Sequence, residues 1–386
     1  MTNSKILNCN NEIINPAIVS ADNCCVVDES GNKYIDFESG LWCAILGHGN
    51  RQVNDAMIKQ IGNISHTGYR YSAKIVEEAA EKVLTLLNFD GGKCVFLTAG
   101  SEAVEFGVQL AKKVVERQYF LCLEDYFLAS YGMAANRDKD SWISLDLSKY
   151  NENPDDFLKN VPFEKISAFI FEPGSASGLV KPPPKGLIEA IERKIKQSGG
   201  IFIVNEVTTG IGRTGKWFGF EHYDICPDIV SMGKGIGNGY PVSVVALSKN
   251  VADSAEKSEF RYSQSHQNDP LGCAVVKEVI TVIENNHYIK RSAEIGIILE
   301  HELIALQRKH KIVKDVRGVG LMFVIEFHSD MNFPLEKIHR KLFDAGYIVG
   351  FLARANLFRF DPPITIEAEQ IKAMTNTLDN LLNKHG

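Results

Sequence analysis

Apolar, β-rich runs alternate with helix-patterned segments through the middle of the chain, and this alternation restricts the fold more than any other feature of the sequence. The runs that predict strands lie at 93–98, 119–123, 166–171, 200–205, 228–232 and 242–247. Helical patterns at 102–117 and 187–197 lie between them. Because the runs are continuously apolar, helices are expected to cover both faces of their sheet. The pattern predicts an α/β fold with a doubly wound, mostly parallel sheet.

The two ends of the chain have a different pattern and are expected to form a second, smaller unit. After about residue 285 the sequence predicts one long helix to about 309, strand-like segments, and further helices at 335–345 and from 367 onward. Strand-like pieces at 24–27 and 33–37 belong with them. We therefore expect a large domain over 46–285 and a small α+β domain formed by 1–45 together with 286–386.

Composition excludes several classes of protein. The net charge is -6 and no block of basic residues is present, so no nucleic-acid partner is expected. No apolar run is long enough to span a membrane, and the polar N-terminal segment is unlike a secretory signal. The eight cysteines are scattered without a C-x-x-C pair, which favours free thiols in the cytoplasm. No metal site is predicted.

Polar residues and glycines follow the predicted strands, where ligands bind in parallel sheets. Gly100 and Ser101 stand between a strand and a helix, a place where backbone N–H groups can hold a phosphate. Ser101 as a simple helix cap is an alternative that the residues leave open. Glu172 and Asn205 each follow a buried strand. These positions predict a ligand site at one edge of the sheet.

Lys234 lies between glycines after another apolar strand, in the sequence SMGKGIG. Lysine is seldom placed deep in a protein without a partner or a chemical role. A partly desolvated lysine is a good nucleophile, and Schiff-base formation is its main use. Together with a phosphate site and a strand-end partner for a ring nitrogen, it indicates a pyridoxal phosphate pocket.

The stretch from Asn205 to Pro241 resembles the signature of class III (ornithine/ω-amino acid type) PLP-dependent aminotransferases. It contains NEVTTGIGRTG, FEH, PDI and KGIGNGYP in the family's order. Four further stretches look like other parts of the family: YIDFESGLWCAILGHGN (34–50), TAGSEAVE (98–105), VRGVGLM (316–322) and FRFDPPIT (358–365). The resemblance implies the aspartate aminotransferase-like fold, fold type I. It also implies transfer of an amino group between an amino acid or ω-amine and a 2-oxo acid, with pyridoxal 5'-phosphate as cofactor.

Because of this resemblance, we expect residues at the matching positions of this chain to have the roles that they have in the family. Lys234 is expected to form the Schiff base with the cofactor and to move the proton at the substrate carbon. Gly100 and Ser101 are expected to hold the phosphate. The resemblance places Tyr126 against one face of the cofactor ring and Val207 against the other.

Further roles follow from the same resemblance. Glu172 matches a glutamate near the cofactor, and Ser265 matches a residue that reaches the phosphate of a neighbouring subunit, which implies a homodimer. Arg359 matches the arginine that binds a substrate carboxylate, a task suited to a bidentate guanidinium. An ion pair with Asp361 is the alternative for Arg359. Trp42 is expected either in the substrate pocket or in the core.

Three departures from the family pattern stand in the pocket itself. Asn205 replaces the aspartate that keeps the ring nitrogen protonated, and a neutral amide cannot stabilise that charge equally well. Thr208 replaces a glutamine that contacts the ring hydroxyl. The segment 126–130 reads YFLAS and lacks the arginine that acetylornithine-type members use, which argues against that substrate.

These departures leave alternatives open. The chain could be an amino acid racemase or epimerase on the same scaffold, a weakly active variant, or a PLP-binding protein without catalysis. Lys234, the phosphate loop and Arg359 argue against the last of these. Arg213, Glu206 and Asp228 are assigned structural roles rather than chemistry.

Overall fold

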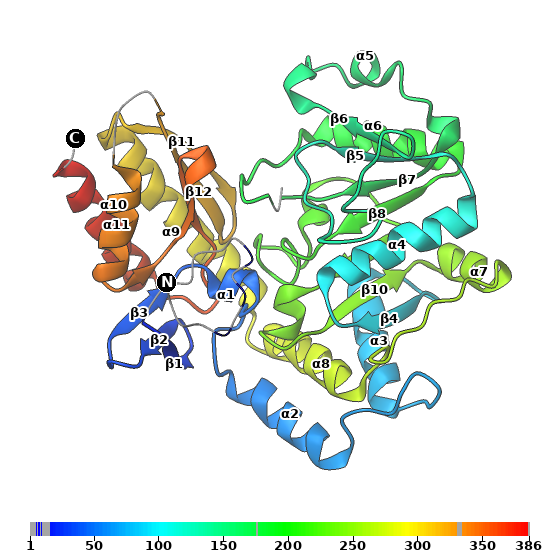
Figure 1. The fold of residues 1–386 in the computed structure, drawn as a ribbon, viewed down its shortest axis with the longest axis horizontal. Coiled ribbons are helices and arrows are strands. Elements are labelled where there is room, and N and C mark those ends of the chain that lie inside the picture. Colours follow the sequence, from blue (N-terminus) through cyan, green and yellow to red (C-terminus); the bar gives the residue numbers. More distant parts are fainter. Residues whose placement is uncertain are drawn as a thin grey trace.

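The computed structural model describes residues 5, 7, 9, 16–174, 177–329 and 334–384, and their strands lie in two lobes (Figure 1). The large lobe holds a seven-stranded sheet in the order β4-β10-β9-β8-β7-β5-β6. Its strands are β4 (Lys93–Leu97), β5 (Tyr119–Leu123), β6 (Trp142–Leu145), β7 (Ile166–Phe171), β8 (Ile201–Asn205), β9 (Ile229–Met232) and β10 (Ser243–Leu247). Pairing is parallel from β9 through to β6, and only β10 runs against its neighbours. The predicted α/β fold with a mostly parallel sheet is confirmed.

Helices pack against the central strands of this sheet, as the apolar runs predict. Every residue of β7 and β8 is buried. Helix α4 (Gly100–Val115) contacts β7, β8, β9 and β10, and α6 (Lys185–Ser198) contacts β7 and β8. The other α-helices described before residue 286 are α1 (Ser39–Trp42), α2 (Arg51–Asn63), α3 (Lys74–Leu87), α5 (Pro154–Leu158), α7 (Lys249–Lys257) and α8 (Pro270–Asn285).

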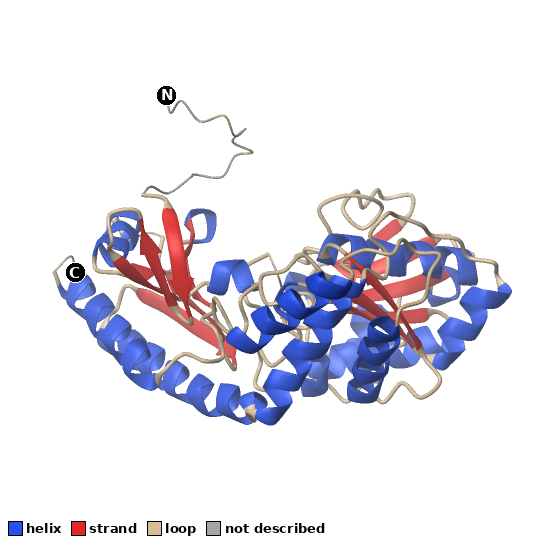
Figure 2. Ribbon diagram, turned by 90° about the horizontal axis from the view of Figure 1, so that it is seen from below, coloured by secondary structure: helices blue, strands red, loops and turns tan. Residues whose placement is uncertain are grey.

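The small lobe combines the two ends of the described chain. One antiparallel sheet has the order β11-β12-β15-β14, and a second has the order β1-β2-β3-β13. The strands are β1 (Ile18–Asp22), β2 (Cys25–Asp28), β3 (Lys33–Asp36), β11 (Val313–Val319), β12 (Met322–Phe327), β13 (Tyr347–Ile348), β14 (Gly350–Leu352) and β15 (Leu357–Phe360). Parallel pairing of β3 with β13 joins N-terminal to C-terminal residues. Helices α9 (Tyr288–Lys309), α10 (Leu335–Asp344) and α11 (Ala368–Asn383) belong to this lobe, and long helices run along one side of its strands (Figure 2). The domain boundaries at 45/46 and 285/286 stay predictions.

The long helix expected after about residue 285 is confirmed, since α8 ends at Asn285 and α9 runs from Tyr288 to Lys309. His287, the N-cap residue of α9, has φ 54°, in the left-handed region. Strand β6 was not predicted, because its four residues include only a short apolar run.

The sheet topology brings several strand ends to one edge. Because β10 is antiparallel to both β4 and β9, strands β4 and β9 point the same way, and β7 and β8 are parallel to β9. The carboxyl ends of these four strands therefore lie at the same edge, where ligands of open α/β sheets bind. The described helices include none that is long and apolar enough to cross a membrane.

Candidate active site

Lys234 stands just after β9 at this edge, in a backbone conformation that is unusual for lysine. Its φ is 46°, and strain of this kind is typical of functional positions. The Nζ atom donates to Thr208 Oγ1 at 3.4 Å and lies 5.2 Å from the centre of the Trp42 ring. Burial lowers the pKa of the ammonium group from its ordinary value, which favours the neutral amine that acts as a nucleophile.

The β4–α4 turn places Gly100 and Ser101 at the start of a 16-residue helix. The N-cap is Ala99, and its side chain makes no capping bond, so the alternative that Ser101 caps the helix is wrong. The Ser101 hydroxyl instead accepts a hydrogen bond from the Ser130 N–H at 3.0 Å. A helix N-terminus without a capping side chain, with a serine hydroxyl beside it, is a setting that favours a phosphate.

The predicted phosphate site at the start of α4 can be tested at Gly100, because this residue is expected to tolerate no side chain. A Cβ there would lie 2.5 Å from Val207 Cγ1, so Gly100→Ala should push Val207 toward the cofactor and weaken cofactor binding at least about tenfold by overpacking. The dissociation constant of the cofactor, from absorbance titration, measures this. Gly107→Ala on the same helix is the matched control, because its Cβ would meet nothing closer than 3.6 Å. Equal cofactor binding by both variants would contradict the assignment.

Asn205, the last residue of β8, holds its side-chain amide in a defined orientation. Its Oδ1 accepts from the Val207 N–H at 3.1 Å, and its Nδ2 donates toward the Phe127 carbonyl at 3.5 Å. The side chain is buried. The amide therefore keeps its oxygen on the protein backbone, and its second N–H group can donate to a ligand.

The two aromatic residues after β5 differ in what their rings can contact. Tyr126 is only 3% exposed and packs in the core near Phe171 and Tyr223. Phe127 is 45% exposed, and its carbonyl is the partner of Asn205. A ring that stacks on a cofactor needs one face open to the pocket. Tyr126 is therefore poorly placed for the predicted stacking, and Phe127, one residue later, is the better candidate for that role.

Glu172, directly after β7, is fully buried, and its charge raises the pKa of Lys234 against the effect of burial. The two acidic residues assigned structural roles have them. Glu206 accepts hydrogen bonds from the Thr209 hydroxyl and from the N–H groups of Gly219 and Phe220, and burial raises its pKa to about 7. The Asp228 carboxylate accepts from the Phe202 N–H at 2.9 Å.

Arg359, on β15 of the small lobe, also lies at the site. Its Nε donates to Asp361 Oδ2 at 2.7 Å and its Nη2 to Glu38 Oε1 at 2.9 Å. The guanidinium carbon lies 3.9 Å from the centre of the Trp42 ring. The ion pair with Asp361, given as the alternative for Arg359, is therefore present. Trp42 lies close to both Arg359 and Lys234, which favours the pocket over the core for this tryptophan.

Arg213, for which the sequence predicts a structural role, connects several segments of the chain. It is completely buried and donates to Ser39 Oγ at 2.9 Å, to the Leu321 carbonyl at 3.2 Å and to the Pro362 carbonyl. Burial lowers its pKa to about 10. These bonds tie the large lobe to three separate segments of the chain. They also hold the segment 39–42, in which all four residues have positive φ, so that Trp42 faces the site.

Ser265 lies on the loop before α8 and is exposed. Its expected role toward a neighbouring subunit stays a prediction. The other residues taken together fit pyridoxal phosphate: a helix start with Ser101 for the phosphate, a cradle at Gly100 that a Cβ would fill, and the Lys234 amine. They define a cofactor pocket of the type that a reactive lysine serves.

Comparisons with known proteins identify the family of this chain. A sequence model of the family described as Aminotransferase class-III matches residues 7–142 and 143–382. The chain belongs to this family. It is 28% identical over 369 residues to an acetylornithine aminotransferase of Bacillus subtilis, covering 93% of each chain.

Two solved structures share the fold over nearly the whole chain. A Bacillus anthracis aminotransferase has a TM-score of 0.87 and 26% identity, with 95% of this chain and 93% of that chain covered. An amine transaminase from an uncultivated Pseudomonas species, in its PLP-bound form, has a TM-score of 0.89 and 21% identity with full coverage of both chains. The protein is thus an enzyme, a PLP-dependent aminotransferase of fold type I. The comparisons give the racemase alternative no support.

Proposed function

We propose that Lys234 bonds to the cofactor's aldehyde carbon and moves the proton at the substrate carbon during amino transfer. Bound pyridoxal phosphate supplies the electron sink for that carbon. Ser101 and the N–H groups at the start of α4 would hold the phosphate, and Asn205 would face the ring nitrogen. Val207 and Phe127 would enclose the ring, and Glu172 would lie beside it. The lowered pKa of Lys234 and its strained backbone support its role.

We further propose that the substrates are an amine donor with an apolar side chain and a 2-oxo acid whose carboxylate binds Arg359. One observation carries this proposal: the Arg359 guanidinium and the Lys234 amine both lie against the Trp42 ring, at 3.9 and 5.2 Å. A substrate whose carboxylate binds Arg359 and whose reacting carbon lies at Lys234 would then contact the Trp42 ring. The absence of arginine from 126–130 and the exposed Phe127 ring favour apolar side chains over charged ones.

A panel of donors and acceptors tests the proposal. Purified holoenzyme is mixed with amines and amino acids that differ in side chain, and conversion of the cofactor to its aminated form is followed by absorbance. We expect conversion with several apolar donors and recovery with 2-oxo acids. Failure with the whole apolar set, or a clear preference for cationic side chains, would overturn the substrate assignment while leaving the family intact.

Glu38 is expected to compete with substrates for Arg359. Burial raises the pKa of Glu38, an effect that Arg359 opposes, and its side chain is 22% exposed whereas Asp361 is fully buried. A substrate carboxylate would therefore displace Glu38, not Asp361. With Glu38→Gln, oxo-acid substrates should bind more tightly and show a KM about tenfold lower, since a charged hydrogen bond contributes about 1.5–3 kcal/mol.

Steady-state kinetics with paired substrates measures the effect of Glu38→Gln. Amines without a carboxylate should keep their KM. In the native enzyme, protonation of Glu38 should lower the KM for the oxo acid as pH falls, whereas the glutamine variant should lack this trend. Glu29→Gln, an exposed glutamate of the same lobe, serves as the control. An unchanged KM in Glu38→Gln would show that the pair does not limit carboxylate binding.

We propose that the enzyme is a homodimer whose second copy covers α2 and the segment after it. Large apolar side chains are exposed there: Ile58, Ile61, Ile64, Tyr69 and Tyr71 at 68, 56, 45, 52 and 75%. Apolar groups exposed together on one segment typically mark an interface. Sedimentation equilibrium at micromolar concentration should give twice the chain mass of 42.9 kDa, and a monomer would refute the dimer. The cytoplasmic location stays a prediction for cell fractionation to check.

A further inference from the structure

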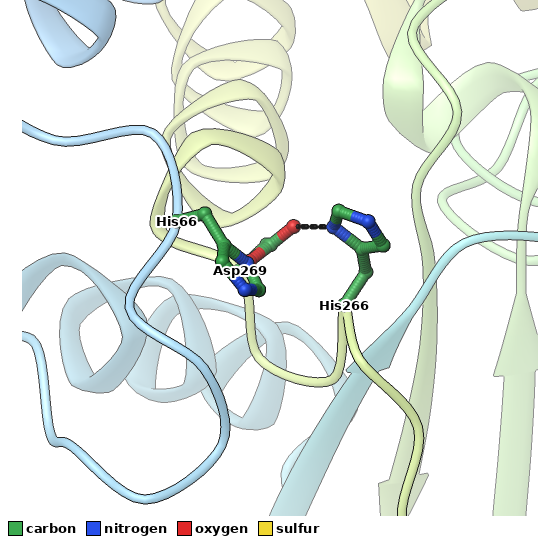
Figure 3. A group of neighbouring side chains, drawn as sticks. All are labelled: His66, His266 and Asp269. Atoms are coloured by element: carbon green, nitrogen blue, oxygen red, sulfur yellow. Dashed lines mark hydrogen bonds and ion pairs between the residues drawn. The ribbon is translucent and has the colours of Figure 1, made fainter.

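Three potential metal ligands meet where the segment after α2 lies beside the loop before α8 (Figure 3). Both histidines, His66 and His266, direct Nδ1 at the carboxylate of Asp269, each toward a different oxygen. The His266 contact is 2.5 Å, and the two imidazole rings lie 4.9 Å apart. The three ligand atoms all lie within 4.8 Å of one another. None of these residues has a place in the proposed amino transfer.

Asp269 is the N-cap residue of α8, yet it does not cap the helix. A capping aspartate normally accepts a hydrogen bond from an N–H of the first turn. The Asp269 side chain makes no such bond, and Pro270 follows it at the first helical position. Both of its oxygens are directed to the two histidines instead. The carboxylate is thus arranged for the histidine cluster rather than for the helix.

We propose that His66, His266 and Asp269 bind a divalent transition-metal ion, with Zn²⁺ as the ion that fits best. Two imidazole nitrogens and one carboxylate oxygen are ligands that zinc accepts at about 2.0–2.2 Å. Imidazole favours transition metals over Mg²⁺ or Ca²⁺, which bind all-oxygen sites. Modest movement from the present hydrogen-bonded arrangement brings the three atoms around one ion.

In the single chain the histidine side chains are 44 and 58% exposed, and that of Asp269 is 16% exposed. Because His66 lies in the segment that the second copy is proposed to cover, the ion would lie at the dimer interface. A cavity of about 210 Å³ is lined by His266 and Asp269 together with Thr98 and Tyr240. It gives room for a fourth ligand such as water or a small anion, which zinc sites with three protein ligands typically hold. The ion would also link His66 to Asp269, which are 203 residues apart in sequence.

Zinc binding to the intact holoenzyme tests the site. Wild type, His66→Asn and His266→Asn are freed of metal with chelator, returned to buffer and dialysed against micromolar Zn²⁺, and bound zinc per chain is measured. The wild type is expected to bind one ion, and each variant at least tenfold more weakly. His301→Asn, an exposed histidine on α9, is the matched control and should bind like wild type. Asp269 is kept, because it begins α8.

Two further measurements separate this site from adventitious binding by the free cysteines. Zn²⁺ should raise the Tm of wild type and of His301→Asn, but not of either site variant, because an ion that binds only the folded state stabilises it. Co²⁺ in the same site should give the weak visible bands of nitrogen and oxygen ligands, without the strong thiolate charge-transfer band. Equal zinc binding by all four proteins, thiolate spectra, or no zinc bound by wild type would each overturn the proposal. The result does not depend on the substrates proposed above.

Discussion

Alanine in place of Lys234 is expected to lower the rate of amino transfer at least about a thousandfold, within the range that a positioned acid–base group contributes. The variant loses both the amine that bonds to the cofactor and the group that moves the proton. Its neighbours Thr208 and Trp42 cannot replace the amine, since one is a neutral hydroxyl and the other an indole. Alanine keeps the Cβ atom that the backbone already accommodates at φ 46°, so the variant is expected to stay folded.

The covalent bond between Lys234 and the cofactor can be measured in addition to the rate of amino transfer. Borohydride reduction of wild type should fix the cofactor to the chain, and peptide mass spectrometry should find it on Lys234. The Lys234→Ala chain should gain no such mass. Lys216→Ala provides the control, because Lys216 is exposed on the same stretch and donates to the Glu221 carbonyl. Cofactor found on another lysine, or activity retained by Lys234→Ala, would remove Lys234 from the mechanism.

The strands of the large sheet could be predicted because burial on both faces leaves a strong local pattern. Strands β5 and β7 begin and end at the expected residues. The start of α9 could also be placed to within a few residues, because the pattern changes after about residue 285. Strand β6 could not be predicted, since its four residues include only a short apolar run.

Some residues of the candidate site could be placed from the sequence, and others could not. Lys234, Gly100 and Asn205 could be placed from the sequence, because each follows a predicted strand and the strand ends share one edge. The choice between Tyr126 and Phe127 could not, since both are aromatic and only burial distinguishes them. Contacts between segments that are distant in sequence could also not be predicted. Glu38 and Arg359 are 321 residues apart, so no local pattern connects them.

Aspartate in place of Asn205 is expected to speed amino transfer about a hundredfold. A carboxylate near the cofactor's ring nitrogen stabilises a proton there, and an opposite charge at close range shifts a pKa by about 1–3 units. In the native chain Asn205 keeps Oδ1 on the Val207 N–H, so it presents an N–H donor on its other side. That donor suits an unprotonated ring nitrogen. The asparagine enzyme should therefore hold the ring neutral and withdraw fewer electrons from the substrate carbon.

Two controls distinguish this cause from a general change in the pocket. Asn205→Ala removes the amide without adding charge and should not gain rate. Nitrogen NMR of isotope-labelled cofactor should show a protonated ring nitrogen only in the aspartate variant. Without cofactor, Asn205→Asp should have a lower Tm than wild type, because its second oxygen would face the Phe127 carbonyl, 3.5 Å from the present Nδ2. Adding cofactor should reverse that loss. A protonated ring without a rate gain would mean that some step other than proton movement at the substrate carbon limits this enzyme.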